Sequence, residues 1–319
     1  MHRRTLLIGS LPATLLTSRR SRAADRLTLA VGQKGNWDTS VAEMGMRAGL
    51  FHKHDLDLDI LYTQGSGETL QAVLSRSAEA GIGVGTLGAI GAFAKGAPVR
   101  IIASEATGAG DLFWYVRADS PIKSLKDTNG KTLAFSTQGS STNSVVLGFV
   151  ATFGIKPELV STGGIPGTYT QVMSGQIDVG WSAAPYLLDA AEEGKIRIIG
   201  SGNDVPSMRN QTVRVNIAHA AMLETRRPVL ERFTAAYREA AQWMYQSPDA
   251  AKAYAAFAGV SERLVPRLRS EFFPDGAIFS ERITGIDPLM ADAIRFKFIQ
   301  SPLSEAQVAQ LIQIPASKS

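Results

Sequence analysis

Apolar and polar residues follow one another in a repeating order along the first third of the chain. Short β-rich runs alternate with segments whose apolar residues recur at helical spacing. The pattern predicts strands over 27–31, 56–62, 81–84 and 99–103, with helices over 41–51, 68–74 and 89–94. Strands separated by helices form βαβ units, so the sequence predicts an α/β protein with a mostly parallel sheet.

A second series of the same kind begins near Leu112, and a helical tail follows it. It predicts strands over 112–116, 132–135, 177–181, 196–199 and 212–217, with helices over 143–153, from 169 and over 186–193. The tail contains a long amphipathic helix. Its apolar stripe is typical of a protein core and consists of Leu230, Phe233, Tyr237, Ala240 and Met244.

Two arrangements of these series are possible. They can be two sequential domains, or the chain can cross into a second lobe and return, so that the tail completes the first lobe. The second arrangement makes a hinge of two crossing segments, near Leu112–Arg117 and Thr212–Asn216. Ligands of open α/β sheets bind beyond the carboxyl ends of the strands, so two facing lobes place the site in the cleft between them.

Residues 1–23 have the pattern of a signal peptide. Arg3-Arg4 precedes an apolar stretch, and Ser21-Arg22-Ala23 provides small residues before a cleavage position at Ala24. The arginine pair resembles a twin-arginine export signal, and an ordinary Sec signal is the alternative. No later segment has 18 uninterrupted apolar residues, so we expect a mature protein that is soluble and periplasmic.

The formal charge of +4 comes from this leader, which contains five arginines and no acid. The rest of the chain has 28 basic and 29 acidic residues and no long basic run, which argues against nucleic-acid binding. The chain contains no cysteine, which excludes disulfides, thiolate metal sites and cysteine nucleophiles.

The loop Ser136–Thr142 joins a predicted strand to a predicted helix and is rich in hydroxyl groups. A helix N-terminus with free N–H groups binds anions, and Gly139 lets a ligand come close to the backbone. The alternative is ordinary N-capping by Ser141 or Thr142, without a ligand.

Trp37 and Trp181 lie at predicted strand ends, where each can enclose a ligand or pack in a lobe core. Lys34 is the one basic residue in the predicted cleft loops. The sequence therefore favours a monoanion that is held mainly by neutral donors and helix dipoles.

Searches for catalytic motifs find no nucleophile elbow, Walker A loop or H-E-x-x-H. Gly83–Gly88 matches G-x-G-x-x-G with Glu105 beyond it, but the match falls on the third strand and is a weak signal for dinucleotide binding. We expect no catalytic residues, no metal and no cofactor.

Three segments carry a family resemblance, and their order and spacing are more specific than any one of them. They are Glu43–Phe51, which ends in Gly-Leu-Phe, Gly130–Ser141 and Gln171–Trp181. Together they resemble the nitrate/sulfonate/taurine-type solute-binding proteins of ABC importers, which include binders of thiamine pyrimidine precursors. The resemblance is clear over residues 27–220 and looser in the tail.

The resemblance implies a two-lobed type II periplasmic-binding-protein fold with a helical C-terminal extension. Lobe 1 would comprise residues 24–112 and 212–319, and lobe 2 residues 113–211. It also implies a monomer that closes around a small organic anion and delivers it to a membrane permease. The implied ligand shell is Asn36, Trp37, Ser66, Thr86, Ser140, Ser141 and Trp181.

An exported enzyme and a sensory ligand-binding module on the same fold are the alternative functions. The pyrimidine-precursor enzymes of this fold carry a cysteine-rich motif, which this chain lacks. Trp37, Trp114 and Trp181 favour an organic over an inorganic anion.

Overall fold

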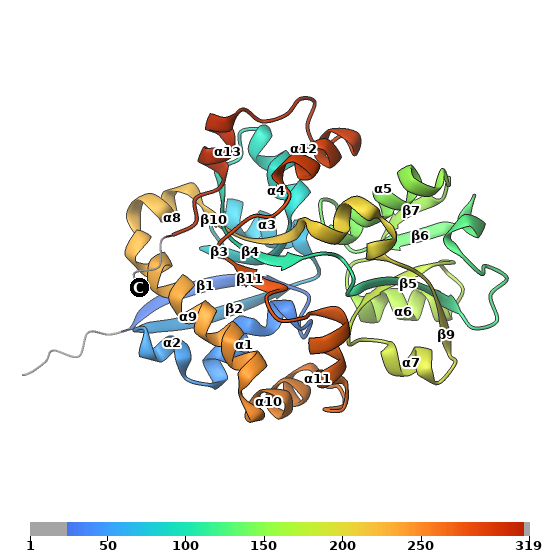
Figure 1. Cartoon of the computed structure of the whole chain (residues 1–319), viewed down its shortest axis with the longest axis horizontal. Coiled ribbons are helices and arrows are strands. Elements are labelled where there is room, and N and C mark those ends of the chain that lie inside the picture. The colour runs from blue at the N-terminus through green and yellow to red at the C-terminus, as the bar shows by residue number, and fades with distance from the viewer. Residues whose placement is uncertain (1–23, 316–319) are drawn as a thin grey trace, which may run out of the picture.

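The computed structural model describes residues 24–315, which form two β-sheets covered by helices (Figure 1). The predicted leader, residues 1–23, lies outside the described residues. The first sheet has the strand order β11-β4-β10-β3-β1-β2. Its strands are β1 (Asp25–Gly32), β2 (Leu56–Thr63), β3 (Ala80–Gly85), β4 (Val99–Thr107), β10 (Thr212–His219) and β11 (Ile278–Ser280).

The direction of β10 corrects the expected mostly parallel sheet. β1 is parallel to both β2 and β3, as the βαβ pattern predicts. β10 is inserted between β3 and β4 and runs antiparallel to both of them. It runs in the opposite direction because it is the strand on which the chain returns from the second sheet.

The second sheet forms around β5 (Leu112–Arg117), which pairs antiparallel with β8 (Gly180–Ala183) and β9 (Ile196–Ser201). A parallel pair, β6 (Thr132–Phe135) and β7 (Glu158–Ser161), is joined to it by a bridge between Leu133 and Val179. The sequence pattern predicts neither β7 nor β11, because both are very short.

Helices cover both sheets (Figure 1). Those of the first series are α1 (Val41–Arg47), α2 (Leu50–Lys53), α3 (Ser66–Leu74) and α4 (Thr86–Ala94). Those of the second series are α5 (Ser141–Phe153), α6 (Ile165–Met173) and α7 (Leu188–Glu192). The tail contributes α8 (Ala220–Thr225), α9 (Arg227–Gln246), α10 (Pro248–Ala258), α11 (Leu264–Arg267), α12 (Ile286–Arg295) and α13 (Glu305–Leu311). Among residues 24–315, no helix is long and apolar enough to span a membrane.

The chain passes between the sheets twice. The segments expected to cross, Leu112–Arg117 and Thr212–Asn216, are themselves strands, and each crossing lies just before them, at 108–111 and 202–211. The two crossings are in contact, because the Gly108 amide donates a 3.0 Å hydrogen bond to the Gln211 carbonyl.

The tail helix α9 packs against the N-terminal part of the chain. All five residues of the predicted apolar stripe are buried, which confirms the amphipathic pattern. α1 approaches α9 closely at Gly45, where an added Cβ would lie 2.6 Å from Ala240 Cβ and 2.6 Å from the Phe51 ring. The two ends of the chain thus share one hydrophobic core.

We predict that Gly45→Val destabilises the protein by about 1–3 kcal/mol, since the larger side chain overpacks the contact between α1 and α9. The free energy of unfolding from urea denaturation measures this. An unchanged midpoint would contradict the close approach of the two helices.

Candidate functional site

A small cavity lies where loops of the first sheet meet loops of the second. It is lined by the ends of β1, β2 and β3 on one side and by residues after β6 and within β8 on the other, together with Arg214 of β10. Its free volume is about 30 Å³, which accommodates water but not an organic anion. A larger ligand therefore requires the two sets of loops to separate.

The structure brings four of the seven residues of the predicted ligand shell to this cavity. They are Asn36, Ser66, Ser141 and Trp181, all of them buried. They come from both sheets, so the cavity is shared between them.

Trp37 is not among the lining residues and packs in the core of the first sheet's half of the molecule. Its ring is fully buried and lies edge-on to Tyr254 at 4.8 Å and to Tyr245 at 5.9 Å. The Arg269 guanidinium lies 5.5 Å from its ring centroid. The loop after β1 turns this side chain toward the tail helices, which is the core-packing alternative that the sequence left open.

Thr86 and Ser140 also stay outside the cavity and hold the backbone instead. The Thr86 hydroxyl donates a 2.7 Å hydrogen bond to the Thr212 carbonyl. Ser140 is the N-cap of α5, and its Oγ accepts a 3.1 Å hydrogen bond from the Asn143 amide. The capping that the sequence analysis assigned to Ser141 or Thr142 therefore belongs to Ser140, which leaves Ser141 at the cavity wall.

Trp181 and Trp114 form a cross-strand pair with different polar environments. Trp114 Nε1 donates a 2.8 Å hydrogen bond to the Ala134 carbonyl, and its ring packs edge-on against Phe149 at 4.8 Å. Trp181 Nε1 is buried without an acceptor in the described part of the chain. A buried donor without a partner is unfavourable, so Trp181 has a free hydrogen-bonding position next to the cavity.

Two helix N-termini meet at the cavity. Ser66 begins α3, whose N-cap Gly65 provides no side-chain hydrogen bond, and Ser141 begins α5. The first N–H groups of a helix and the positive end of its dipole favour an anion. The cavity thus combines two such ends from opposite sheets.

Glycines allow the two sides to approach each other. A Cβ on Gly85 or Gly88 would lie 2.4 or 2.3 Å from the Gly139 carbonyl oxygen. The same stretch, Gly83–Gly88, gave the dinucleotide-like match. In the structure, Gly85 and Gly88 let this stretch come close to the Gly139 loop of the other half. Glu105 lies in a buried polar cluster.

Arg214 is a cavity residue that the sequence analysis missed. It lies on β10 with 5% of its surface exposed. Its Nη2 donates a 2.8 Å hydrogen bond to Asp111 Oδ1, and its Nε lies 2.7 Å from Asp38 Oδ2. An arginine within the otherwise small and apolar start of a strand was the signal that could have identified it.

Arg214, rather than Lys34, provides the positive charge at the cavity. Burial alone would lower the pKa of Arg214, but the charges of Asp111 and Asp38 outweigh burial and raise it, so the guanidinium stays charged. Lys34, which the sequence placed in the cleft, instead lies over the rings of Tyr62 and Phe257 at 5.5 and 5.4 Å.

Glu105 lies behind Arg214 in the same buried cluster. Its Oε1 accepts a 2.7 Å hydrogen bond from the Tyr237 hydroxyl, and its Oε2 accepts one from Asn216 Nδ2. Burial raises the pKa of Glu105 to about 8, and the charge of Asp38 adds to this effect. Burial likewise raises the pKa of Asp38.

Polar contacts also join the two halves at the rim of the cleft. The Gly67 amide donates a 3.0 Å hydrogen bond to Thr137 Oγ1. At another point of the rim, the Tyr186 hydroxyl donates to the Lys34 carbonyl at 3.2 Å. Near α7, Arg263 pairs with Asp189 and Glu192, and Arg267 pairs with Glu192.

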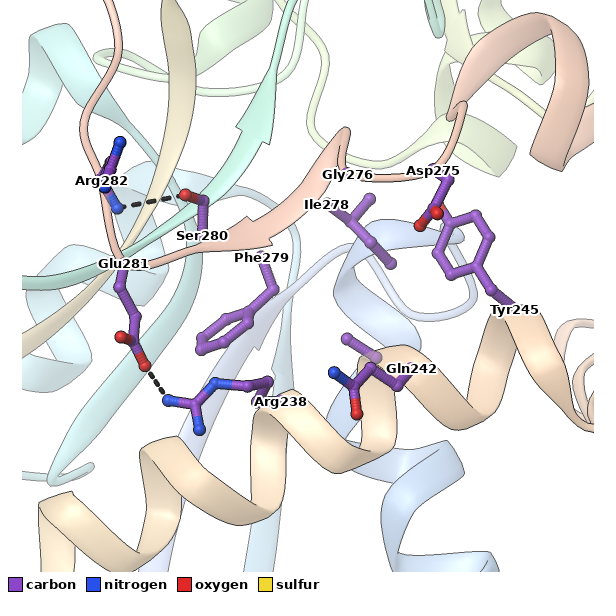
Figure 2. A pocket seen from close by; sticks show the side chains of 11 residues that line it. Arg238, Gln242, Tyr245, Asp275, Gly276, Ile278, Phe279, Ser280, Glu281 and Arg282 are labelled. Carbon is purple, nitrogen blue, oxygen red and sulfur yellow. Dashed lines mark hydrogen bonds and ion pairs between the residues drawn. The ribbon is translucent and has the colours of Figure 1, made fainter. Parts of the chain in front are cut away.

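A second cavity, of about 390 Å³, lies between α9 and β11 (Figure 2). Figure 2 shows Glu281 pointing to Arg238, with which it forms an ion pair, and Asp275 beside Tyr245. Phe279, at a positive φ of 47°, lines this cavity and packs its ring 5.1 Å from Tyr237. Through Tyr237 this outer wall contacts the buried Glu105 cluster.

Comparison with known families identifies the family of the chain. A family model described as NMT1/THI5 like matches residues 43–251. This span is more than half of the chain, so the chain belongs to the NMT1/THI5-like family, and the resemblance found in the sequence is confirmed. Comparison with curated proteins finds no match.

Solved structures show the same fold at low sequence identity. The alkanesulfonate-binding protein SsuA from Xanthomonas axonopodis pv. citri, bound to MOPS, is 15% identical, with a TM-score of 0.75 over 91% of this chain and 98% of that chain. A Candida albicans gene product with the generic periplasmic binding protein fold is 13% identical, with a TM-score of 0.74 over 92% and 98%. The desulfurization enzyme DSZB is 18% identical, with a TM-score of 0.61 over 89% and 95%. The periplasmic-binding-protein fold is thus confirmed.

We predict that Ser140→Ala lowers the free energy of unfolding by about 1 kcal/mol, because it removes the N-cap of α5. Ser141→Ala is the matched control, since the side chain of Ser141 caps nothing and should leave stability nearly unchanged. Equal losses in thermal denaturation would contradict the assignment of the cap to Ser140.

Proposed function

We propose that this protein is the extracytoplasmic solute-binding subunit of an ABC importer. It binds a small organic anion, a sulfonate or a carboxylate, in the cleft between two lobes and delivers it to a permease in the cytoplasmic membrane. In this proposal lobe 1 comprises residues 24–112 and 212–319 and lobe 2 residues 113–211, with the crossings at 108–111 and 202–211 as the hinge. The family membership supports the solute-binding role, and the predicted leader supports a periplasmic location.

The observation that carries the proposal is the set of donors gathered at the cavity shared by the two sheets. Trp181 offers an unpartnered N–H, Arg214 a buried guanidinium, and Ser66 and Ser141 the N-termini of two helices. Preorganised donors in a site shielded from water bind anions strongly, because no further reorganisation is needed.

The proposed mechanism is closure of the cleft. The cavity admits little more than one water in this conformation, so binding requires opening at the hinge and reclosing over the ligand. The start of α4 at Gly85–Gly88 and the loop at Gly139 come close to each other, because a side chain on Gly85 or Gly88 would meet the Gly139 backbone. The polar contacts at the rim form only when the halves meet, so they stabilise the closed state.

An exported enzyme is the alternative, which the similarity to the desulfurization enzyme favours. The chain contains no cysteine, so any chemistry in the cleft would have to proceed without a thiolate. We propose a monomeric receptor without turnover.

A thermal-shift screen of residues 24–319 tests the proposal. The panel contains taurine, alkyl and aryl sulfonates, nitrate, aromatic carboxylates and pyrimidine precursors. A ligand at 100 times its Kd should add about 2.7 kcal/mol of stability. Binding confined to uncharged compounds would contradict the proposal that the ligand is an anion. Conversion of a bound compound to a product would favour the enzyme.

For the anion that binds, we predict that Trp181→Phe weakens affinity by roughly 10- to 100-fold, because it removes one donor to a charged ligand while keeping an aromatic ring. Trp114→Phe is the matched control. It should lower stability without changing affinity, since its N–H is already bound to Ala134. If calorimetry gives both variants the same affinity for the anion, Trp181 does not contribute to binding.

A further inference from the structure

The buried charges next to the cavity do not balance. Arg214 is the one cation that faces three carboxyl groups, those of Asp38, Asp111 and Glu105, which are 0%, 1% and 0% exposed. Both oxygens of Asp38 and Oδ2 of Asp111 lack a hydrogen bond of good geometry within the described residues. The cluster thus has more negative charge than its single guanidinium and its donors can stabilise.

Among residues 24–315, the elements packed around Glu105 place no second cation against it. β10 contributes Arg214 and Asn216, α9 contributes Tyr237, and the short 3-10 helix Asp38–Ser40 contributes another acid, Asp38. β11, which pairs with β4, contributes only Ile278–Ser280. A buried carboxylate in such surroundings is more stable with its proton bound.

We infer that the anion-bound cleft holds a proton on Glu105, so that the anion binds with uptake of that proton wherever the free protein has lost it. The inference rests on the proposed function, since it concerns the anion of that site. According to this inference, the charge of the ligand is offset by protonation of the protein in addition to the positive charge of Arg214.

The physical reason is electrostatic. An anion at the cavity lies beside Arg214, whose positive charge is already shared with Asp38 and Asp111. Each further negative charge in this poorly solvated region raises the pKa of the neighbouring carboxyl groups. Burial already raises the pKa of Glu105 to about 8, so an anion shifts it further up and proton uptake follows.

The direction of the pH dependence follows from linkage. Well below pH 8, Glu105 is protonated with and without the anion, so affinity is independent of this group. Between the pKa of Glu105 in the free protein and its higher pKa in the complex, binding takes up a proton, and affinity falls by up to about tenfold per pH unit.

The test is titration calorimetry of the folded chain with ethanesulfonate, nitrate and benzoate, each fully ionised throughout. Each anion is titrated at about pH 6 and about pH 9 in two buffers of different ionisation enthalpy, which reports the protons taken up. We expect proton uptake with the bound anion at the higher pH and none at the lower. Glu105→Gln should abolish the uptake. Glu79→Gln, a half-buried glutamate paired with Arg226 away from the cluster, should retain it.

The possible outcomes test the inference, the proposed function and the assignment of the proton to Glu105 separately. Binding without proton uptake overturns the inference and leaves the proposed function standing, whereas no binding of any anion, in these titrations or in the thermal-shift panel, overturns both. Uptake that persists in Glu105→Gln but disappears in Asp38→Asn overturns the assignment to Glu105. If Glu105→Gln does not fold, the uptake by the unmodified protein still decides the main claim.

Discussion

The guanidinium of Arg214 holds together three parts of the chain that are far apart in sequence. It lies on the returning strand β10, contacts Asp38 in the loop after β1, and contacts Asp111 at the first crossing between the sheets. Removing one partner of a buried ion pair typically costs about 3–5 kcal/mol, because the other charge stays buried alone. Asp38 and Asp111 are therefore held in fixed positions relative to β10, on the first sheet's side of the cavity.

The cavity depends on this arrangement. The start of α3 lies on the first sheet's side of the cavity, and the start of α5 and Trp181 lie on the second sheet's side. Gly85, Gly88 and Gly139 let the backbones of the two sides come close. The binding donors belong to both halves. A ligand that contacts both of them stabilises the closed arrangement over the open one, which couples binding to the motion that a permease would recognise.

Much of the fold follows from local patterns, while the site follows only in part. The βα alternation and the α9 stripe are local features, so the sequence predicts them well. The direction of β10 depends on a crossing that no local pattern records. Trp37 and Trp181 both lie at predicted strand ends, yet tertiary packing places Trp37 in the core and Trp181, within β8, at the cavity. Arg214 lies within a strand, whereas the sequence analysis considered charged residues only in the loops.

Closure of the two halves over a bound anion is the central claim, and an interspin distance tests it directly. The chain has no cysteine, so Ser75→Cys in the first half and Lys156→Cys in the second, both exposed, introduce the only two sites for spin labels. Pulsed electron resonance then measures the distance between them with and without a saturating anion from the ligand panel. We expect a broad distribution of distances between the labels without the anion. The distribution should shift and narrow to one closed distance when the anion binds. An identical distribution in both samples, with binding verified, would contradict this claim.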